Sequence, residues 1–225
     1  MCVIIYKQKQ KQLPSRDFLL RCWTANEDGA GFAYNDGKKV YYHKGFEKFK
    51  DFYNALLECD ARSKLYNKDV VIHFRIATSG GITAEKTHPF EITSSYKRME
   101  KLNGVCNSAF FHNGIISNFA SKNYSDSENY NALILSRIKN LENQKTLVDY
   151  LARVTNSRFA IITKNDVLLG NDFLEDNGYL VSNKNYTHYY NTSYNNFDKI
   201  DFNYPMWKSN KRQLYIYDDY NKFND

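Results

Sequence analysis

Hydrophobic and polar residues follow two different periods along the first 183 residues of the chain. Period-two alternation and short apolar runs rich in β-branched and aromatic residues predict strands. A hairpin is predicted over 29–45, with its turn at Asn35 to Gly37, because these residue types tolerate a positive φ. The other predicted strands cover residues 2–7, 69–77, 107–114, 158–164, 166–170 and 178–183.

Apolar residues three or four positions apart predict four helices, each with one buried face. The first begins near Pro14 and Ser15 and ends before Gly29, and the others cover 47–64, 127–141 and 146–154. Strands come in runs and do not alternate one for one with helices, which favours antiparallel sheets covered by helices. The predicted fold class is therefore α+β.

The periodic pattern stops near residue 183. Residues 184–225 are polar and rich in Tyr and Asn, with no apolar face at either period. We therefore expect one domain over 1–183 and a separate C-terminal tail over 184–225.

Charge and cysteine content narrow the class of protein. The net charge is +6, but the basic residues are scattered, so binding of nucleic acid is not favoured, although it stays open. The four cysteines form no C-x-x-C pair and no metal-like spacing with the histidines, so we expect neither a metal site nor a cofactor nor a disulfide framework. No apolar stretch approaches the ~18 residues that span a membrane. A reducing cytoplasm fits best.

The opening stretch "MCVIIYK" places a cysteine directly after the initiator methionine. If Met1 stays, Cys2 is a small hydrophobic residue at the head of a buried strand. If Met1 is removed, Cys2 offers a thiol and a free α-amine, whose pKa of about 7.7–8.0 suits a base for that thiol.

Four further stretches bear on Cys2: "NEDGAGFAY", "HFRIATSGG" followed by "HPF", "FFHNGIISN" and "SDSE". Each has a structural alternative. Asn113 and Gly114 could merely turn the chain, Arg75 could form a structural ion pair, and Asp126 could only cap a helix. In this order after an N-terminal cysteine, however, the stretches resemble the class II glutamine amidotransferases, and the resemblance runs from Cys2 to about Asn183.

The resemblance implies a stand-alone glutaminase domain with the four-layer αββα fold of the N-terminal-nucleophile hydrolases. It also implies that L-glutamine is hydrolysed to glutamate and ammonia through a γ-glutamyl thioester on Cys2. By the same comparison, the Asn113 side-chain amide and the Gly114 backbone N–H form the oxyanion hole. His73 and His88 correspond to scaffold residues.

The resemblance assigns the substrate contacts as well. Arg75 would clamp the α-carboxylate of glutamine, Thr78 would place a hydroxyl near it, and Asp126 would receive the α-ammonium. In the stretch "ATSGG", Ser79 stands where the biosynthetic members commonly have His, which we interpret as a mark of a subfamily.

The ammonia acceptor is not visible in the sequence. No synthetase domain fits in the tail, so the resemblance implies a separate acceptor protein as partner. Two alternatives stay open: an amidase for another γ-glutamyl amide, and a catalytically silent scaffold that binds nucleic acid or protein.

Overall fold

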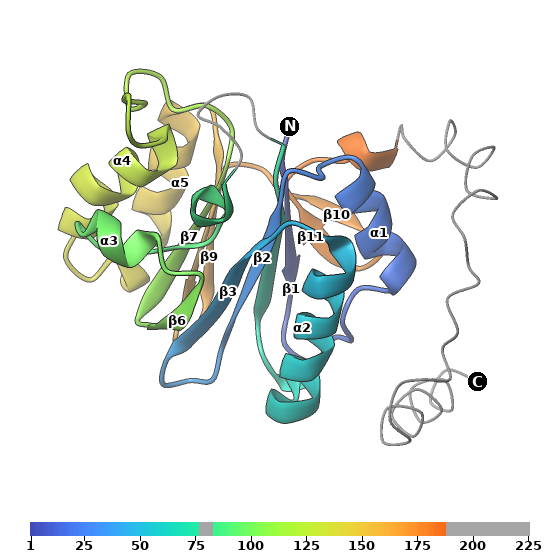
Figure 1. Cartoon of the computed structure of the whole chain (residues 1–225). Coiled ribbons are helices and arrows are strands. Elements are labelled where there is room, and N and C mark those ends of the chain that lie inside the picture. Colours follow the sequence, from blue (N-terminus) through green and yellow to red (C-terminus); the bar gives the residue numbers. More distant parts are fainter. Residues whose placement is uncertain (77–82, 188–225) are drawn as a thin grey trace, which may run out of the picture. The chain divides into compact units, whose positions relative to one another are not determined.

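The computed structural model describes residues 1–76 and 83–187, and these residues form two antiparallel sheets (Figure 1). The strands of the larger sheet are β1 (Val3–Lys7), β2 (Ala30–Asn35), β3 (Val40–Phe46), β4 (Val70–Phe74), β6 (Asn103–Cys106), β10 (Leu174–Asp176) and β11 (Tyr179–Val181). Those of the smaller sheet are β5 (Phe90–Glu91), β7 (Ser108–Asn113), β8 (Arg158–Thr163) and β9 (Val167–Gly170). The strand orders are β10-β11-β1-β4-β2-β3-β6 and β5-β7-β8-β9, and every neighbouring pair is antiparallel.

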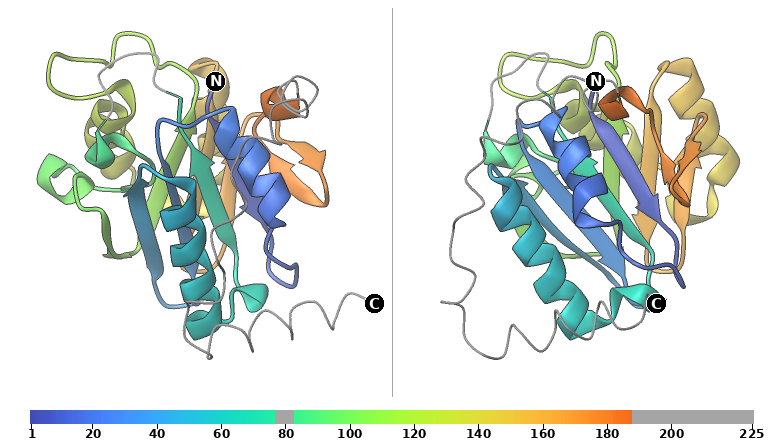
Figure 2. Two further views of the ribbon diagram at one scale, coloured as in Figure 1. Left: turned by 45° about the vertical axis from the view of Figure 1, so that its right-hand side comes forward. Right: turned by 90° about the vertical axis from the view of Figure 1, so that its right-hand side faces the viewer.

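Helices lie on the outer faces of the two sheets (Figures 1 and 2). The α-helices are α1 (Arg16–Thr24), α2 (Phe49–Ser63), α3 (Tyr96–Met99), α4 (Asp126–Leu133) and α5 (Lys145–Val154). Short 3₁₀ turns are η1 (Leu65–Asn67), η2 (Ala84–Lys86), η3 (Leu135–Arg137), η4 (Leu141–Asn143) and η5 (Asn185–Thr187). Helices α1 and α2 cover the larger sheet, and α4 and α5 cover the smaller one. The predicted α+β class with two antiparallel sheets is confirmed.

Alternation along β1 divides its side chains between two hydrophobic layers. Val3 and Ile5 pack beneath α1 and α2, whereas Ile4 and Tyr6 face the smaller sheet. Since successive strand residues point to opposite faces, Cys2 continues the row of Ile4 and Tyr6, toward the space between the sheets.

The helix predicted over 127–141 is shorter than expected. It ends at Leu133, and after Ile134 the chain tightens into η3. Leu133, Ile134 and Leu135 are consecutive apolar residues, which one helical face cannot bury together. The tighter turn buries Leu135 completely and leaves Leu133 47% exposed.

Several short elements escaped prediction. Strands β5, β6 and β10 and helix α3 contain two to four residues each, too few for a period to show. The hairpin of β2 and β3 was predicted correctly, and the strand expected over 69–77 ends at Phe74.

The packed structure continues past residue 183. Tyr186 in η5 is 1% exposed, lies edge-on to Phe18 with ring centroids 5.6 Å apart, and donates a hydrogen bond to the Asp176 carboxylate. The separate tail over 184–225 stays a prediction, because the described residues end at 187.

Neither a membrane span nor a metal cluster is found in the described part of the chain. None of its helices combines the length and the apolar character that crossing a bilayer requires. Residues 1–76 and 83–187 also hold no group of three His, Cys, Asp or Glu side chains able to bind a metal ion.

Candidate active site

Strand pairing brings Cys2 beside Arg75. Cys2 precedes β1 and Arg75 follows β4, and the antiparallel register that pairs Val3 with Phe74 places these two residues next to each other. The Cys2 thiol accepts a 3.4 Å hydrogen bond from the Ile76 N–H and lies 3.5 Å from the Ile76 carbonyl oxygen, to which it donates. Arg75 itself is 8% exposed.

Burial raises the pKa of the Cys2 thiol above its ordinary value. The Ile76 hydrogen bond, the positive N-terminal amine and the Arg75 guanidinium oppose this shift in part. A thiol with a raised pKa is mostly protonated at neutral pH, so attack on a substrate requires a base. Met1 precedes Cys2 and is 60% exposed, so solvent reaches this residue.

The D-G-A-G stretch lies on the other side of Arg75. The Arg75 N–H donates to the Gly29 carbonyl over 2.8 Å, and the Arg75 carbonyl accepts from the Asp28 N–H over 3.0 Å. Gly29 has φ +132°, and a Cβ there would lie 2.6 Å from Cγ2 of Thr87. Only glycine fits this position, which keeps the backbone close beside Arg75.

Asn113 reaches the Cys2 strand from the other sheet. It is the last residue of β7 and shares the inward face of Phe111. Its Nδ2 donates a 2.8 Å hydrogen bond to Ser182 Oγ, which also accepts the Ile4 N–H over 2.9 Å. The side chains of Asn113 and Cys2 thus point to the same space between the sheets.

Residues Ser182 and Asn183 were missed by the sequence reasoning. Asn183 Nδ2 donates to the Cys2 carbonyl over 2.7 Å, and Ser182 bonds both Ile4 and Asn113. The sequence feature that could have identified them is their position as two polar residues directly after the apolar strand 179–181, although such pairs usually begin loops.

Gly114 follows Asn113 in a conformation that favours glycine. Its φ is +147°, and a Cβ there would lie 2.5 Å from Ser157 Oγ. Ser157 therefore packs directly against the backbone of Gly114 and holds it in position.

Asp126 is the first residue of α4, but it does not cap the helix. Ser125 is the N-cap, and it forms a capping box with Glu128. The Asp126 carboxylate instead accepts the Ile116 N–H and the Ser127 N–H, each over 2.7 Å. Asp126 is therefore tied to the segment that follows Gly114. Thr78 and Ser79 lie outside the described residues.

Three buried histidines lie near these residues. The ring centroids of His73 and His88 are 4.6 Å apart, and those of His88 and His112 are 6.2 Å apart. Burial lowers the pKa of His73 to about 3 and that of His112 to about 4, and it holds the pKa of His88 well below its ordinary value. All three rings are neutral at pH 7.

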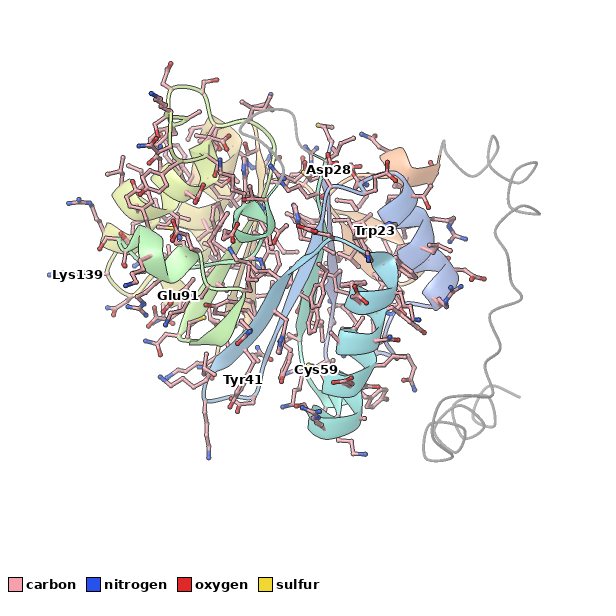
Figure 3. The ribbon with its side chains drawn as sticks, in the orientation of Figure 1. Trp23, Asp28, Tyr41, Cys59, Glu91 and Lys139 are labelled. Carbon is pink, nitrogen blue, oxygen red and sulfur yellow. The ribbon has the colours of Figure 1, made fainter. Side chains whose placement is uncertain are left out.

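The other cysteines have different surroundings. Cys22 is fully buried, and burial raises the pKa of Cys106 to about 12. Cys59 is half-buried and contacts His43 Nε2 at 3.6 Å. Figure 3 shows Cys59 on α2, toward the opposite end of the sheet from Asp28.

A scan against protein-family models finds no match. A segment of 93 residues, 41% of this chain, is 32% identical to an amidophosphoribosyltransferase from Methanocaldococcus jannaschii. A solved structure described as the allosteric regulatory enzyme of purine biosynthesis matches 80% of this chain with a TM-score of 0.50 and 20% identity, a likeness of fold.

The chain is distantly similar to amidophosphoribosyltransferase. The match spans 17% of the length of the amidophosphoribosyltransferase and 41% of the solved chain. What the remaining parts of these proteins do is therefore not carried over to this chain.

Proposed function

We propose that this chain is a glutaminase of the class II glutamine amidotransferase type, with the four-layer fold of the N-terminal-nucleophile hydrolases. The observations that carry the proposal are that Cys2 lies beside Arg75, which directly follows β4, and that Asn113 bonds Ser182, whose hydroxyl also accepts the Ile4 N–H. The similarity to amidophosphoribosyltransferase supports it.

The first chemical step needs a base at Cys2. Removal of Met1 would free the α-amine of Cys2, which takes the thiol proton while Sγ attacks the carboxamide carbon of glutamine. The electron pair of the C=O bond moves to oxygen, which becomes an oxyanion.

Asn113 and Gly114 would stabilise that oxyanion. An amide nitrogen carries two hydrogens, and the bond to Ser182 uses one of them, so the Asn113 side chain keeps a second donor. Collapse of the oxyanion breaks the C–N bond. The ammonium proton passes to the leaving nitrogen, ammonia departs and a γ-glutamyl thioester remains on Cys2. Water then attacks the thioester, which releases glutamate and restores the thiol.

Selection of free glutamine would depend on its α-carboxylate and α-ammonium. A guanidinium pairs with a carboxylate in a planar, bidentate manner, which suits Arg75. Two backbone N–H groups occupy part of the Asp126 carboxylate, and the remaining lone pairs can accept an ammonium. Thr78 would add its hydroxyl near the carboxylate. The ammonia would pass to an acceptor on a separate partner protein.

The test is release of glutamate from glutamine by purified protein whose intact mass shows that Met1 is removed. We expect Cys2→Ala to abolish activity and Cys59→Ala, a matched change at another half-buried cysteine, to keep it. A diazoketone analogue of glutamine should label Cys2 alone.

Two other outcomes would overturn the proposal. Hydrolysis of a different γ-glutamyl amide in preference to glutamine would identify the chain as an amidase of another specificity. No hydrolysis, together with salt-dependent binding of single-stranded nucleic acid, would identify a binding scaffold.

A further inference from the structure

His112 lies in a buried hydrogen-bond network between Asp126 and the backbone at Gly114. Its Nδ1 is 2.7 Å from Ser127 Oγ, and its Nε2 is 3.0 Å from Ser157 Oγ. His112 and Ser127 are each 3% exposed, and Ser157 is fully buried. Neither serine can exchange its bond to the ring for one to bulk water.

The contacts of Ser157 and Ser127 together favour one ring nitrogen of His112 as the proton carrier. The Ser157 hydroxyl donates its one hydrogen to the Thr155 carbonyl over 3.1 Å, so it can only accept from the ring. The Ser127 hydroxyl has two acceptors in reach, His112 Nδ1 at 2.7 Å and Asp126 Oδ1 at 3.3 Å, and the shorter contact assigns its hydrogen to Nδ1. With Ser157 as acceptor, we therefore infer that Nε2 is the donor of the neutral ring. Burial lowers the pKa of His112 to about 4, against the charge of Asp126, so the ring keeps one donor and one acceptor at neutral pH.

Each serine touches a residue to which the proposed function gives a task. Ser127 is next to Asp126 and donates its N–H to Oδ1 over 2.7 Å. Ser157 lies against Gly114, where a Cβ would approach its Oγ to 2.5 Å. Asp126 Oδ2 also accepts the Ile116 N–H, which closes the network around the turn 112–116.

We propose that His112 is a positioning residue that links the ammonium site at Asp126 to the oxyanion donors at Asn113 and Gly114. The link runs through Ser127 on one side and Ser157 on the other. We call Asp126, Ser127, His112 and Ser157 the His112 network. This inference rests on the proposed glutaminase function, and nothing in the sequence motifs assigns Ser127 or Ser157 a role.

The first test separates positioning from folding by kinetics. Ser157→Ala should lower kcat for glutamine about tenfold to a hundredfold and change KM less than about threefold, because misplaced donors weaken transition-state stabilisation. Alkylation of Cys2 by iodoacetamide should change less than about twofold, since that displacement forms no oxyanion. The control is Ser136→Ala, which removes a hydroxyl donating to the Ala132 carbonyl outside the network.

Substitutions of His112 test its contact with Ser157 and its contact with Ser127 separately. The amide of His112→Gln reaches the Nε2 position and retains a donor for Ser157, whereas that of His112→Asn reaches only the Nδ1 position. We expect the Gln variant to retain more kcat than the Asn variant. Adding Ser157→Ala to His112→Asn should cost no more than about a further twofold, because that contact is already lost. Fully additive losses, or a fall of iodoacetamide alkylation in step with kcat, would overturn the proposal.

The second test does not depend on activity. Long-range ¹H–¹⁵N NMR of ¹⁵N-histidine protein should show the Nε2–H form of His112 at pH 7. The Gly114 amide resonance should shift in Ser157→Ala and in Ser127→Ala, but not in Ser136→Ala. An Nδ1–H form, or no shift at Gly114, would overturn the network, even if the chain hydrolyses glutamine. Absence of hydrolysis with these NMR results intact would instead refute the proposed function.

Discussion

The side-chain amide of Asn113 donates a 2.8 Å hydrogen bond to the hydroxyl of Ser182, and the same hydroxyl accepts the N–H of Ile4, two residues after Cys2. One buried serine thus aligns a donor on the smaller sheet with a strand of the larger sheet. The distance between Cys2, the proposed nucleophile, and Asn113, the proposed oxyanion donor, therefore depends on a residue near the end of the described chain.

Ser182→Ala is expected to lower kcat about tenfold and to leave KM for glutamine nearly unchanged, because Asn113 loses the contact that orients it. Steady-state kinetics measure the effect. Thr163→Val serves as the control, since it also removes buried hydrogen bonds but lies at the far end of β8. Both variants should lose stability, and equal kinetic losses in the two would contradict the role of Ser182.

Activity is expected to require a processed N-terminus. An extra bulky residue between Met1 and Cys2 should leave the fold intact, because Met1 is exposed, yet it places the base of the thiol in an amide bond. Glutamate release should become undetectable while thermal melting is unchanged. Cys2→Ser should also release glutamate very slowly or not at all, since an amine of this pKa activates a hydroxyl far less readily than a thiol. Full activity of the insertion variant would exclude the α-amine as base.

Arg75→Gln is expected to raise KM for glutamine about a hundredfold or more, because a buried charged clamp is lost. It should also raise the pKa of Cys2 further, since Arg75 now lowers it. Iodoacetamide alkylation followed against pH would show the shift. Arg62→Gln, which breaks an exposed pair with Glu58, should alter neither quantity. An unchanged KM in Arg75→Gln would remove this residue from the site.

Stability should fall as the pH drops from about 6.5 toward 5. The pKa of buried His112 is about 4 and that of His73 about 3, against about 6.5 in an unfolded chain, so in this range the unfolded state binds more protons. Each such histidine adds about 1.4 kcal/mol per pH unit to the slope of the unfolding free energy. Urea unfolding at a series of pH values measures it. His88→Gln should remove the contribution of one histidine, about 1.4 kcal/mol per pH unit, from the slope of the unfolding free energy. An unchanged slope would show that His88 is protonated in the folded protein.

Truncated chains should show whether the packed domain ends at residue 183 or continues to residue 187. A chain ending after residue 187 keeps Tyr186, whereas one ending after 183 loses its contact with Phe18 and its bond to Asp176. The shorter chain should be less stable by about 3 kcal/mol, as for removal of a buried aromatic side chain. Tyr186→Ala in the full chain should show a similar loss. Equal stability of the two truncated chains would show that the domain ends at 183.

The sequence predicted the layout of the longer elements and most of the candidate residues. Short apolar runs with β-branched or aromatic residues in "CVIIYK" and "NSAFFHNG" were sufficient to identify β1 and β7. The break after Ile134 was not predicted, since it depends on how the apolar side chains 133–135 meet the smaller sheet. Local periodicity carries no information about that contact.

The part of the site that escaped prediction consists of contacts between distant segments. Ser182 bonds Asn113 across 69 positions, and Ser157 meets His112 across 45. Isolated serines at strand ends are common, and no local pattern distinguishes these two. From the sequence, the D-G-A-G stretch was only part of the resemblance, and the positive φ of Gly29 became known from the structure.

Strand order has a consequence for the timing of assembly on the ribosome. β1 leaves the ribosome before the other described strands, but its two neighbours in the sheet are β4 and β11, and β11 ends at Val181. A nascent chain that stops short of this strand therefore exposes one edge of β1 and lacks the serine and asparagine that bond Ile4, Asn113 and Cys2. Cys2, the proposed nucleophile, precedes every described strand, yet the residues that bond around it are complete only after Asn183 has been translated. Under the proposed function, an unfinished chain therefore has no assembled site with which to release ammonia.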